Sequence, residues 1–290
     1  MMKANNKYRL ISLILISFIT LSFSLASAQN KNMKILCYNI LEGMKKDTTE
    51  GKVVFAEWIK AQDPDILALQ EVNKFTQKKL EDLARSYGHP YAVLLKENGY
   101  PVALTSKYPI VNVSKVIDNM HHGFIQAKVA DLNIIVLHLS PHKYWKRREE
   151  IKVVLETIAS SPDKDKWMIM GDFNSLSPLD AGHYTDGLLL KRYQEAKKKY
   201  SFHENLIDND SALDYSIHQA ILEFGLVDGM LQDKSFSVKN EPKGGSRIDF
   251  IYVSKDLKNK VTNGGFITND FTRYYSDHRP VYIELKADKK

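Results

Sequence analysis

Cysteine is nearly absent from this sequence of 290 residues, which contains only Cys37. One thiol cannot form an internal disulfide, so the chain is not a small domain held together by disulfide bonds. With 43% hydrophobic residues, a chain of this length can bury a sizeable core instead. We therefore expect Cys37 to lie inside a strand as a small buried apolar residue.

A large excess of charge of either sign is also missing. Residues 1–28 carry three basic residues and no acid, so their removal lowers the net charge of the chain from +6 to +3. A nearly balanced chain gives little support for a nucleic-acid partner from its charge alone.

The N-terminus has the pattern of a cleaved secretory signal peptide. Three basic residues precede an apolar run, and Ala26-Ser27-Ala28 provides small residues at the usual cleavage spacing. We expect cleavage after Ala28 and an exported protein, either periplasmic or secreted. A retained membrane anchor is the alternative, because the apolar run approaches the length of a spanning helix.

No internal repeat, low-complexity linker or clear boundary divides residues 33–287, which we predict to form one domain. Apolar runs predict strands, and apolar residues at i, i+4 spacing predict helices between them. The predicted strands are residues 33–40, 65–72, 91–95, 100–106, 110–117, 124–130, 133–140, 167–170, 235–238, 247–254, 264–270 and 279–285. The predicted helices are residues 49–62, 75–87 and 144–159. This alternation predicts an α/β sandwich with mixed sheets.

Polar side chains stand where several of the apolar runs end. They are Asn39, Glu71, His138, Asp172, Asn174, Asp249, Asp277 and His278. Taken singly, each has a structural explanation as a turn, cap or core residue, and Asp249 could pair with Arg247. In α/β folds, however, the carboxyl ends of strands face the ligand crevice, so these side chains would converge. Together their carboxylates suit a hard cation such as Mg²⁺, and acid-paired histidines suit proton transfer and phosphate binding.

The spacing of Asp172 and Asn174 in the stretch GDFNSLSP has two explanations. Side chains two positions apart in a strand share one face, so both would reach one ligand if the strand continues this far. A turn explains a sequence of Gly, Asp and Asn equally well.

The segments YNIL, LALQEV, LHLS, GDFNSLSP, RIDFIYVS and SDHRPV follow one another in that order. This set resembles the endonuclease/exonuclease/phosphatase superfamily, the group of deoxyribonuclease I-like phosphoesterases, over about residues 33–286. The resemblance implies a four-layer α/β sandwich of two mixed β-sheets flanked by helices. It also implies that Glu71 is the principal Mg²⁺ ligand, with Asn39 beside it and Asp277 holding the metal or its water. Mn²⁺ is the alternative ion.

The same resemblance implies roles in catalysis for the remaining residues. His278 would accept a proton from the attacking water, and Asp249 would hold its imidazole in the right tautomer. Asp172 would orient or deprotonate the nucleophile, or protonate the leaving oxygen. Asn174 and His138 would bind the phosphoryl oxygens and stabilise the charge that develops there.

Residues 179–224 are the expected source of substrate specificity, because compact relatives need only a short connection at this place. The segment is polar and helical in character, and its run at 197–199 reads as a solvated helix face. The candidate substrate contacts in it are His183, Tyr184, Lys191, Arg192, Tyr193 and His203. After the strand of His138, His142 and Lys143 are two further candidates. A zinc site at His121 and His122 is disfavoured, because adjacent residues of a strand face opposite sides.

The sequence thus predicts an exported, metal-dependent phosphoester hydrolase, favoured as a phosphodiesterase or nuclease. The alternatives are a phosphomonoesterase for sugar, inositol or nucleotide phosphates, and a sphingomyelinase-like lipid phosphodiesterase. A secreted binding protein without catalysis is less favoured, because none of the expected catalytic residues has been lost. We expect a monomer whose partner is its substrate, a nucleic acid, a phospholipid or a small phosphate ester.

Overall fold

The computed structural model describes residues 32–233, 236 and 245–286, and its compact unit spans Met33–Leu285. The predicted signal peptide at 1–28 lies outside the described residues, as does the strand predicted at 235–238, apart from Phe236. Within the described part, no helix is both long and apolar enough to cross a membrane.

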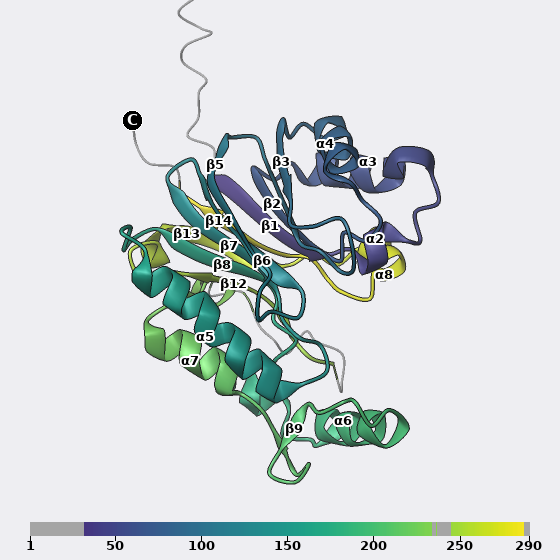
Figure 1. Cartoon of the computed structure of the whole chain (residues 1–290), viewed down its shortest axis with the longest axis vertical. Coiled ribbons are helices and arrows are strands. Elements are labelled where there is room, and N and C mark those ends of the chain that lie inside the picture. Colours follow the sequence, from purple (N-terminus) through teal and green to yellow (C-terminus); the bar gives the residue numbers. More distant parts are fainter. Residues whose placement is uncertain (1–31, 234–235, 237–244, 287–290) are drawn as a thin grey trace, which may run out of the picture. The chain divides into compact units, whose positions relative to one another are not determined.

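Two six-stranded sheets form the centre of this unit (Figure 1). Each sheet is mixed, with one parallel pair, β1 with β2 in the first and β7 with β8 in the second. The first sheet has the order β13 (Val261–Phe266), β14 (Val281–Leu285), β1 (Met33–Asn39), β2 (Ile66–Gln70), β4 (Ala103–Ser106), β3 (Tyr91–Leu94). The second has the order β11 (Val227–Asp228), β12 (Asp249–Val253), β8 (Trp167–Asp172), β7 (Leu132–His138), β6 (Gly123–Val129), β5 (Ile110–Val116).

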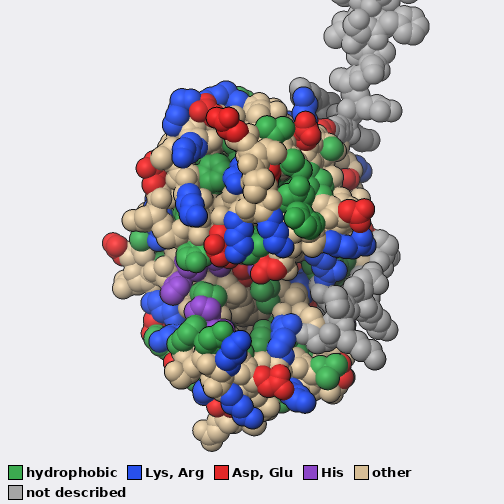
Figure 2. Space-filling model, turned by 90° about the vertical axis from the view of Figure 1, so that its right-hand side faces the viewer, with side chains coloured by type: hydrophobic (Ala, Val, Ile, Leu, Met, Phe, Trp, Pro, Cys, Tyr) green, Lys and Arg blue, Asp and Glu red, His purple; other side chains and the backbone are tan. Residues whose placement is uncertain are grey.

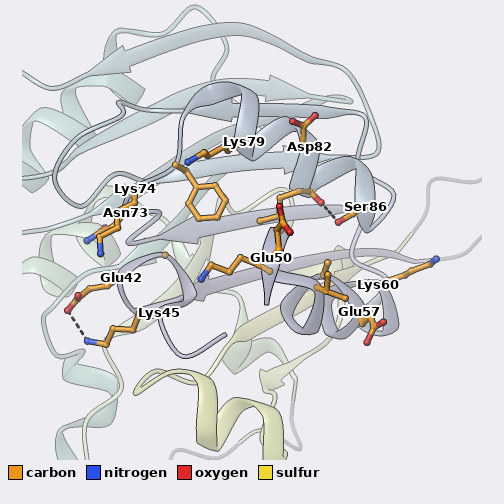
Figure 3. A pocket seen from close by; sticks show the side chains of 17 residues that line it. Glu42, Lys45, Glu50, Glu57, Lys60, Asn73, Lys74, Lys79, Asp82 and Ser86 are labelled. Atoms are coloured by element: carbon orange, nitrogen blue, oxygen red, sulfur yellow. Dashed lines mark hydrogen bonds and ion pairs between the residues drawn. The ribbon is translucent and has the colours of Figure 1, made fainter. Parts of the chain in front are cut away.

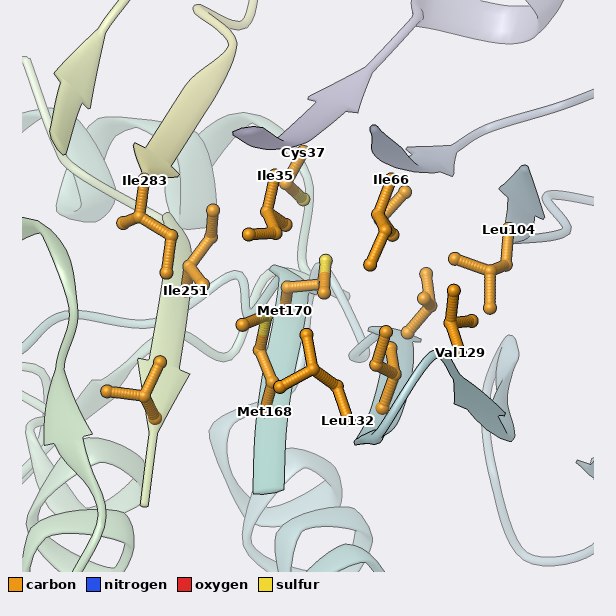
Figure 4. Packing of buried hydrophobic residues seen from close by; sticks show 14 of the residues in the cluster. Ile35, Cys37, Ile66, Leu104, Val129, Leu132, Met168, Met170, Ile251 and Ile283 are labelled. Carbon is orange, nitrogen blue, oxygen red and sulfur yellow. The ribbon is translucent and has the colours of Figure 1, made fainter. Parts of the chain in front are cut away.

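The main core lies between the two sheets (Figure 4). Along β1, Ile35 and Cys37 belong to this core, while Leu36 and Tyr38 belong to the apolar cluster on the other face of the strand. The alternation follows the two-residue period of a strand. The expectation that Cys37 is a small buried strand residue is confirmed.

Helices cover the outer face of each sheet and complete the four layers (Figure 1). α3 (Val53–Gln62) and α4 (Gln77–Ser86) pack against the first sheet. α5 (Tyr144–Ser160) and α7 (Ser216–Phe224) pack against the second. The predicted four-layer α/β sandwich of two mixed sheets is confirmed.

The predicted helices at 75–87 and 144–159 agree with α4 and α5 to within two residues at each end. The helix predicted at 49–62 begins later, because Gly51 has a φ of +67° and a short 3-10 turn precedes α3. Several elements are too short to leave a periodic signal in the sequence. They are α2 (Leu41–Met44), η1 (Glu50–Lys52), β11, η3 (Met230–Gln232), η5 (Lys258–Lys260) and α8 (Asp270–Tyr275).

The segment 179–224 is helical at both ends and contains a small hairpin between them. η2 (Pro178–His183) and α6 (Leu188–Lys199) come first, followed by the antiparallel pair β9 (Leu206–Ile207) and β10 (Ala212–Leu213). α7 then joins the outer layer of the sandwich. Within this insert, α7 therefore belongs to the outer layer, while Leu189 of α6 and Leu213 of β10 pack in a separate small apolar cluster.

A buried ion cluster fixes the start of this insert to the second sheet. The Arg247 guanidinium lies 2.8 Å from Asp180 of η2 and 2.6 Å from Asp228 of β11, and all three side chains are fully buried. A buried charge without a partner is strongly destabilising. Loss of Arg247 would therefore leave two buried carboxylates unpaired, and loss of either acid would leave the guanidinium only partly compensated.

Gly171 sits in β8 directly against the backbone of β7. Its φ is +154°, and a Cβ atom placed on it would lie 2.0 Å from the carbonyl oxygen of Leu137. The contact is with backbone, so no side-chain movement can relieve it. A larger residue would push apart the two strands just before their last pair, His138 and Asp172.

We predict that Gly171→Ala lowers the free energy of unfolding by about 3 kcal/mol or more, because of the backbone clash and the unfavourable φ. Gly182→Ala is the matched control, since a Cβ there meets nothing within 4 Å. It should stay within about 0.5 kcal/mol of the wild type. Urea unfolding measures both variants, and equal stabilities of the two would contradict the account of this close approach.

Candidate active site

Three strand ends of the second sheet bring His138, Asp172 and Asp249 side by side. Parallel pairing of β7 with β8 sets His138 opposite Asp172, and antiparallel pairing of β8 with β12 sets Asp249 opposite Asp172. All three side chains are buried, and His138 Nε2 lies 3.5 Å from Asp172 Oδ2. Strand register therefore places one carboxyl group between an imidazole and a second carboxyl group.

His278 reaches this group from the loop between α8 and β14, and β14 is a strand of the first sheet. Its Nδ1 lies 2.7 Å from Asp249 Oδ2, and its Nε2 lies 3.7 Å from Asp172 Oδ2. The hydroxyl of Ser276 holds the loop, donating to the carbonyl of Asn39 at 2.8 Å and accepting from the amide of His278 at 3.1 Å. Asp249 thus pairs with His278, while the structural alternative, Arg247, is engaged by other acids.

Asn39 and Glu71 lie beside this cluster at the ends of β1 and β2. The amide nitrogen of Asn39 donates to Glu71 Oε1 at 3.2 Å and to Asp172 Oδ2 at 3.1 Å. The backbone amide of Glu42 donates to the second oxygen of Glu71 at 2.9 Å. The Asn39 oxygen accepts from the amide of Leu41, so Asn39 turns its nitrogen, and not its oxygen, toward the two acids.

Burial and neighbouring charge shift the ionisation of this cluster in opposite ways. Burial raises the pKa of Asp172, although the His278 imidazole opposes the shift. Burial opposes a charged His278, yet the carboxylates of Asp249 and Asp172 raise its pKa above the ordinary value. Burial holds the pKa of His138 well below its usual range, and the adjacent His122 lowers it further. At neutral pH, His138 is therefore an uncharged imidazole next to an acid.

The strand ends at Asp172, and Asn174 stands in a turn. Asn174 has a φ of +48°, and its amide donates to Asp172 Oδ1 at 2.8 Å. Its side-chain nitrogen donates to the carbonyl of Leu139 at 3.1 Å. The explanation that strand geometry carries Asp172 and Asn174 onto one face therefore does not hold, because the aspartate side chain closes the turn itself.

Asp277 is exposed and lies next to His278 in the loop before β14. The hydrogen bond that Lys45 donates to Glu42 has the largest effect on the pKa of Lys45 and raises it. The charges of Asp277 and Glu71 raise this pKa further. Glu71 and Asp277 thus act on the same side chain. In the described part of the chain, the group of acids and histidines close enough to share an ion is Asp172, Asp249 and His278.

Comparison with known proteins identifies the family of this chain. The model of the endonuclease/exonuclease/phosphatase family matches residues 36–278, which include every polar strand-end residue described above. The chain belongs to this family. Its members are phosphoester hydrolases, so the protein is a hydrolase of the endonuclease/exonuclease/phosphatase family. No curated protein matches the sequence at a significant level.

Solved structures of family members share the fold at low sequence identity. An abasic-site (AP) endonuclease from Archaeoglobus fulgidus superposes with a TM-score of 0.63 and 18% identity, over 87% of this chain and 99% of that one. A 3′-5′ exonuclease from Neisseria meningitidis gives a TM-score of 0.61 and 21% identity, over 88% of this chain and 100% of that one. A second structure of the same Neisseria enzyme, described there as a 3′ phosphatase and bound to a product DNA hairpin, gives a TM-score of 0.61 and 21% identity, over 88% of this chain and 99% of that one.

Two histidines before β6 extend the cluster. The ring of His122 stacks on that of His138 at 4.2 Å, and His121 packs edge-on against His122 at 4.3 Å. Buried Glu150 of α5 accepts the amides of His121 and Ser140, which holds the loop in place. The sequence predicted that these histidines lie on opposite faces of a strand. This is wrong, because β6 begins only at Gly123 and the two rings, in the loop before it, are in contact.

The predicted substrate residues fall into different surroundings. His142 and Lys143 lie in the loop after β7, close in sequence to His138. Tyr184, in contrast, is buried in a small apolar cluster, and its hydroxyl accepts the amide of Arg247, so it is placed as a structural residue. His183 packs edge-on against Tyr184. Arg192 is exposed on α6 and donates to the hydroxyl of Ser246.

A pocket of about 1010 Å³ lies between α3 and α4 (Figure 3). Glu42, whose backbone amide donates to Glu71, is one of the residues that line it. Figure 3 shows the ion pair of Glu42 with Lys45 at the edge of the pocket. Five lysines line this pocket, together with four acids. With the charges nearly balanced, the pocket has no clear preference for an anion, and His138, Asp172 and His278 do not line it.

The loop after Asp172 rests on a buried histidine of the insert, His218 of α7. Its ring lies against Phe250, with Nδ1 2.8 Å from the Tyr252 hydroxyl and Nε2 3.0 Å from the carbonyl of Ser175. Burial, with a smaller effect of the Arg247 guanidinium, lowers the pKa of His218 to about 3. The neutral ring donates through Nε2 and accepts through Nδ1, and a second proton would remove the acceptor.

We predict that His218 makes folding sensitive to acid. The unfolded chain binds a proton at a pKa of about 6.5, whereas folded His218 does not until about pH 3, so stability falls as the pH drops through this window. One such histidine contributes a slope of roughly 1.4 kcal/mol per pH unit. In His218→Gln the dependence of the unfolding free energy on pH, measured with urea, should be shallower by about one proton. An unchanged slope would contradict the prediction.

Proposed function

We propose that this hydrolase is a metal-dependent phosphodiesterase that cleaves nucleic acid. The observation that carries the proposal is the contact of Asp172 with groups from both sheets, His138, His278 and the amide of Asn39, all within 3.7 Å. Two imidazoles, one carboxyl group and one amide around a single point are suited to a tetrahedral phosphate with an attacking water.

The residues around Glu71 fit a hard divalent cation. Mg²⁺ prefers one or two carboxylates and keeps several waters, and Glu71 is a half-buried carboxylate with exposed Asp277 in the same neighbourhood. Asn39 and the amide of Glu42 fix both oxygens of Glu71, as supporting hydrogen bonds do around metal ligands. A bound Mg²⁺ or Mn²⁺ would supply Lewis-acid stabilisation of the phosphoryl oxygens. Ligation by Asn39 itself would require its amide to turn over.

We assign His278 and Asp172 to proton transfer and His138 and Asn174 to the phosphate. Asp249 holds His278 through Nδ1, which leaves Nε2 directed at Asp172. An attacking water bound beside Asp172 would lie within reach of both groups. Neutral His138 can donate a hydrogen bond to a phosphoryl oxygen without a change of charge. Because the pKa of His278 is raised, its imidazole holds a proton and must lose it before it can accept one from the attacking water. Asp172 is the second proton acceptor within reach.

A nucleic-acid substrate is supported by two structural relatives: an endonuclease, and a Neisseria enzyme that is described both as an exonuclease and as a 3′ phosphatase bound to DNA. The last of these also makes a DNA 3′-phosphomonoester the second candidate. Export through the N-terminal signal is part of the proposal, and mass spectrometry of the periplasmic or secreted protein would show Gln29 as the first residue. An intact N-terminus would contradict export with cleavage.

The reaction is tested by hydrolysis of bis(p-nitrophenyl) phosphate and p-nitrophenyl phosphate, each with Mg²⁺ and with EDTA. We predict that the diester is cleaved only with the metal, and that His278→Ala lowers kcat at least about 100-fold, the usual contribution of a positioned proton acceptor. Glu71→Gln should require more Mg²⁺ for half-maximal rate, because an ion loses a charged ligand.

Glu57→Gln is the matched control for Glu71→Gln, because it neutralises an exposed glutamate on α3 that lines the neighbouring pocket. It should leave the Mg²⁺ requirement unchanged. Cleavage of the monoester alone would replace the diesterase by the phosphomonoesterase, and full activity in EDTA would contradict the metal dependence.

A further inference from the structure

A cluster of four exposed and half-buried rings stands at the tip of the insert and on the loop after β7. We call it the aromatic wall: His142, Tyr200, Phe202 and His203. The imidazoles of His142 and His203 lie 4.6 Å apart, and Phe202 contacts both, at 5.0 Å and 4.7 Å. Tyr200 stacks on His203 at 5.6 Å. The four rings therefore form one continuous surface.

The backbone around the aromatic wall holds its two halves together. Lys143 and Glu204 form a parallel bridge, in which the Glu204 amide donates to His142 and the Tyr144 amide donates to Glu204, at 2.6 Å and 2.8 Å. Buried Arg147 of α5 donates to the carbonyl of Ser140 and to the side chain of Asn205. The aromatic wall is thus formed in advance and needs little ordering when it binds.

The apolar rings of the aromatic wall do not cover a core. Tyr200 and Phe202 are 45% and 49% exposed, and their contacts with other rings are with each other and with the two imidazoles. The ammonium of Lys199 lies over the Tyr200 ring, 5.1 Å from its centre. Lys143 lies nearby, over the exposed ring of Trp145 at 5.0 Å. Exposed rings next to a positive charge are the arrangement on which single-stranded nucleic acids stack their bases.

A row of histidines connects the aromatic wall with the catalytic cluster. His138, beside Asp172, is stacked on His122, and His122 contacts His121. His121 in turn acts electrostatically on His142, the first ring of the aromatic wall. Figure 2 shows histidine side chains gathered at a hollow on one face of the molecule. His138 and His122 are buried, so the exposed His121 and the half-buried His142 mark the side on which a chain with a phosphate at Asp172 would meet the aromatic wall.

We propose that the aromatic wall binds unpaired bases of a single-stranded nucleic acid whose phosphodiester lies at Asp172. This inference rests on the proposed function and names the form of its substrate. Stacking suits it because every base offers a π-face, so strands of any sequence can be held without hydrogen bonds to base edges. A duplex keeps its bases paired and stacked on each other, and offers the aromatic wall only its ends.

The test is the affinity for a fluorescein-labelled thymidine oligonucleotide, followed by anisotropy at one fixed salt concentration in EDTA, which prevents cleavage. Phe202→Ala should weaken binding about ten-fold, the usual effect of removing one stacking ring, and Phe202→Tyr should restore it. Phe224→Ala is the matched control, because Phe224 is 39% exposed at the end of α7, beside Trp167 at the opposite end of β8 from Asp172.

A strand of the same length with base-less linkers in place of thymidines separates stacking from charge. Phe202→Ala and the wild type should bind this strand equally. The inference is overturned if the wild type does not bind the thymidine strand, if Phe202→Ala binds it as tightly as the wild type, or if the loss is the same without bases.

Sedimentation with phosphatidylglycerol vesicles tests a membrane as the occupant of the aromatic wall. Release of Phe202→Ala from vesicles, without any loss of affinity for the thymidine strand, would overturn the inference in favour of a lipid surface. Because these measurements are made without cleavage, their failure would leave the proposed reaction standing. Failure of the wild type to cleave the p-nitrophenyl diester would, separately, contradict the reaction.

Discussion

Two hydrogen bonds that cross from one sheet to the other hold the active site together. Asn39, at the end of β1 in the first sheet, donates to Asp172 of the second sheet at 3.1 Å. His278, in the loop that leads into β14 of the first sheet, lies 2.7 Å from Asp249 of the second. Buried carboxylates are costly without partners, so each bond stabilises the sheet pair and the site at once. The apolar core between the sheets sets their separation, and therefore whether these bonds can form.

The acids of the site fall into two groups with different surroundings. Glu71 and Asp277 are accessible to water, as a ligand set for a hydrated cation needs. Asp172 and Asp249 are buried, where burial and hydrogen bonding control the protons of His278 and Asp172. Asn39 joins the groups, because its amide nitrogen contacts Glu71 and Asp172 together. In our account the first group binds the metal and the second moves protons.

The sequence predicted the layers well, because buried strands leave long apolar runs and their last residues mark the edge of the sheet. It also predicted which strand-end residues would meet, since register carries His138, Asp172 and Asp249 to one edge. It did not predict how Asn39 and Asn174 orient their amides, which depends on turns of two or three residues. Nor did it predict the aromatic wall, because the wall forms where two segments distant in the sequence meet, at the bridge between Lys143 and Glu204 and the hydrogen bond of Arg147 with Asn205.

The most direct test of this division is the position of a bound ion. Mn²⁺ can be located by its anomalous scattering in crystals of the protein lacking residues 1–28 that are grown with the metal. Our account predicts an ion bound to the carboxylate of Glu71. An ion held by Asp172, Asp249 and His278, with Glu71 unbound, would contradict it, because that ion would occupy the groups to which we assign proton transfer.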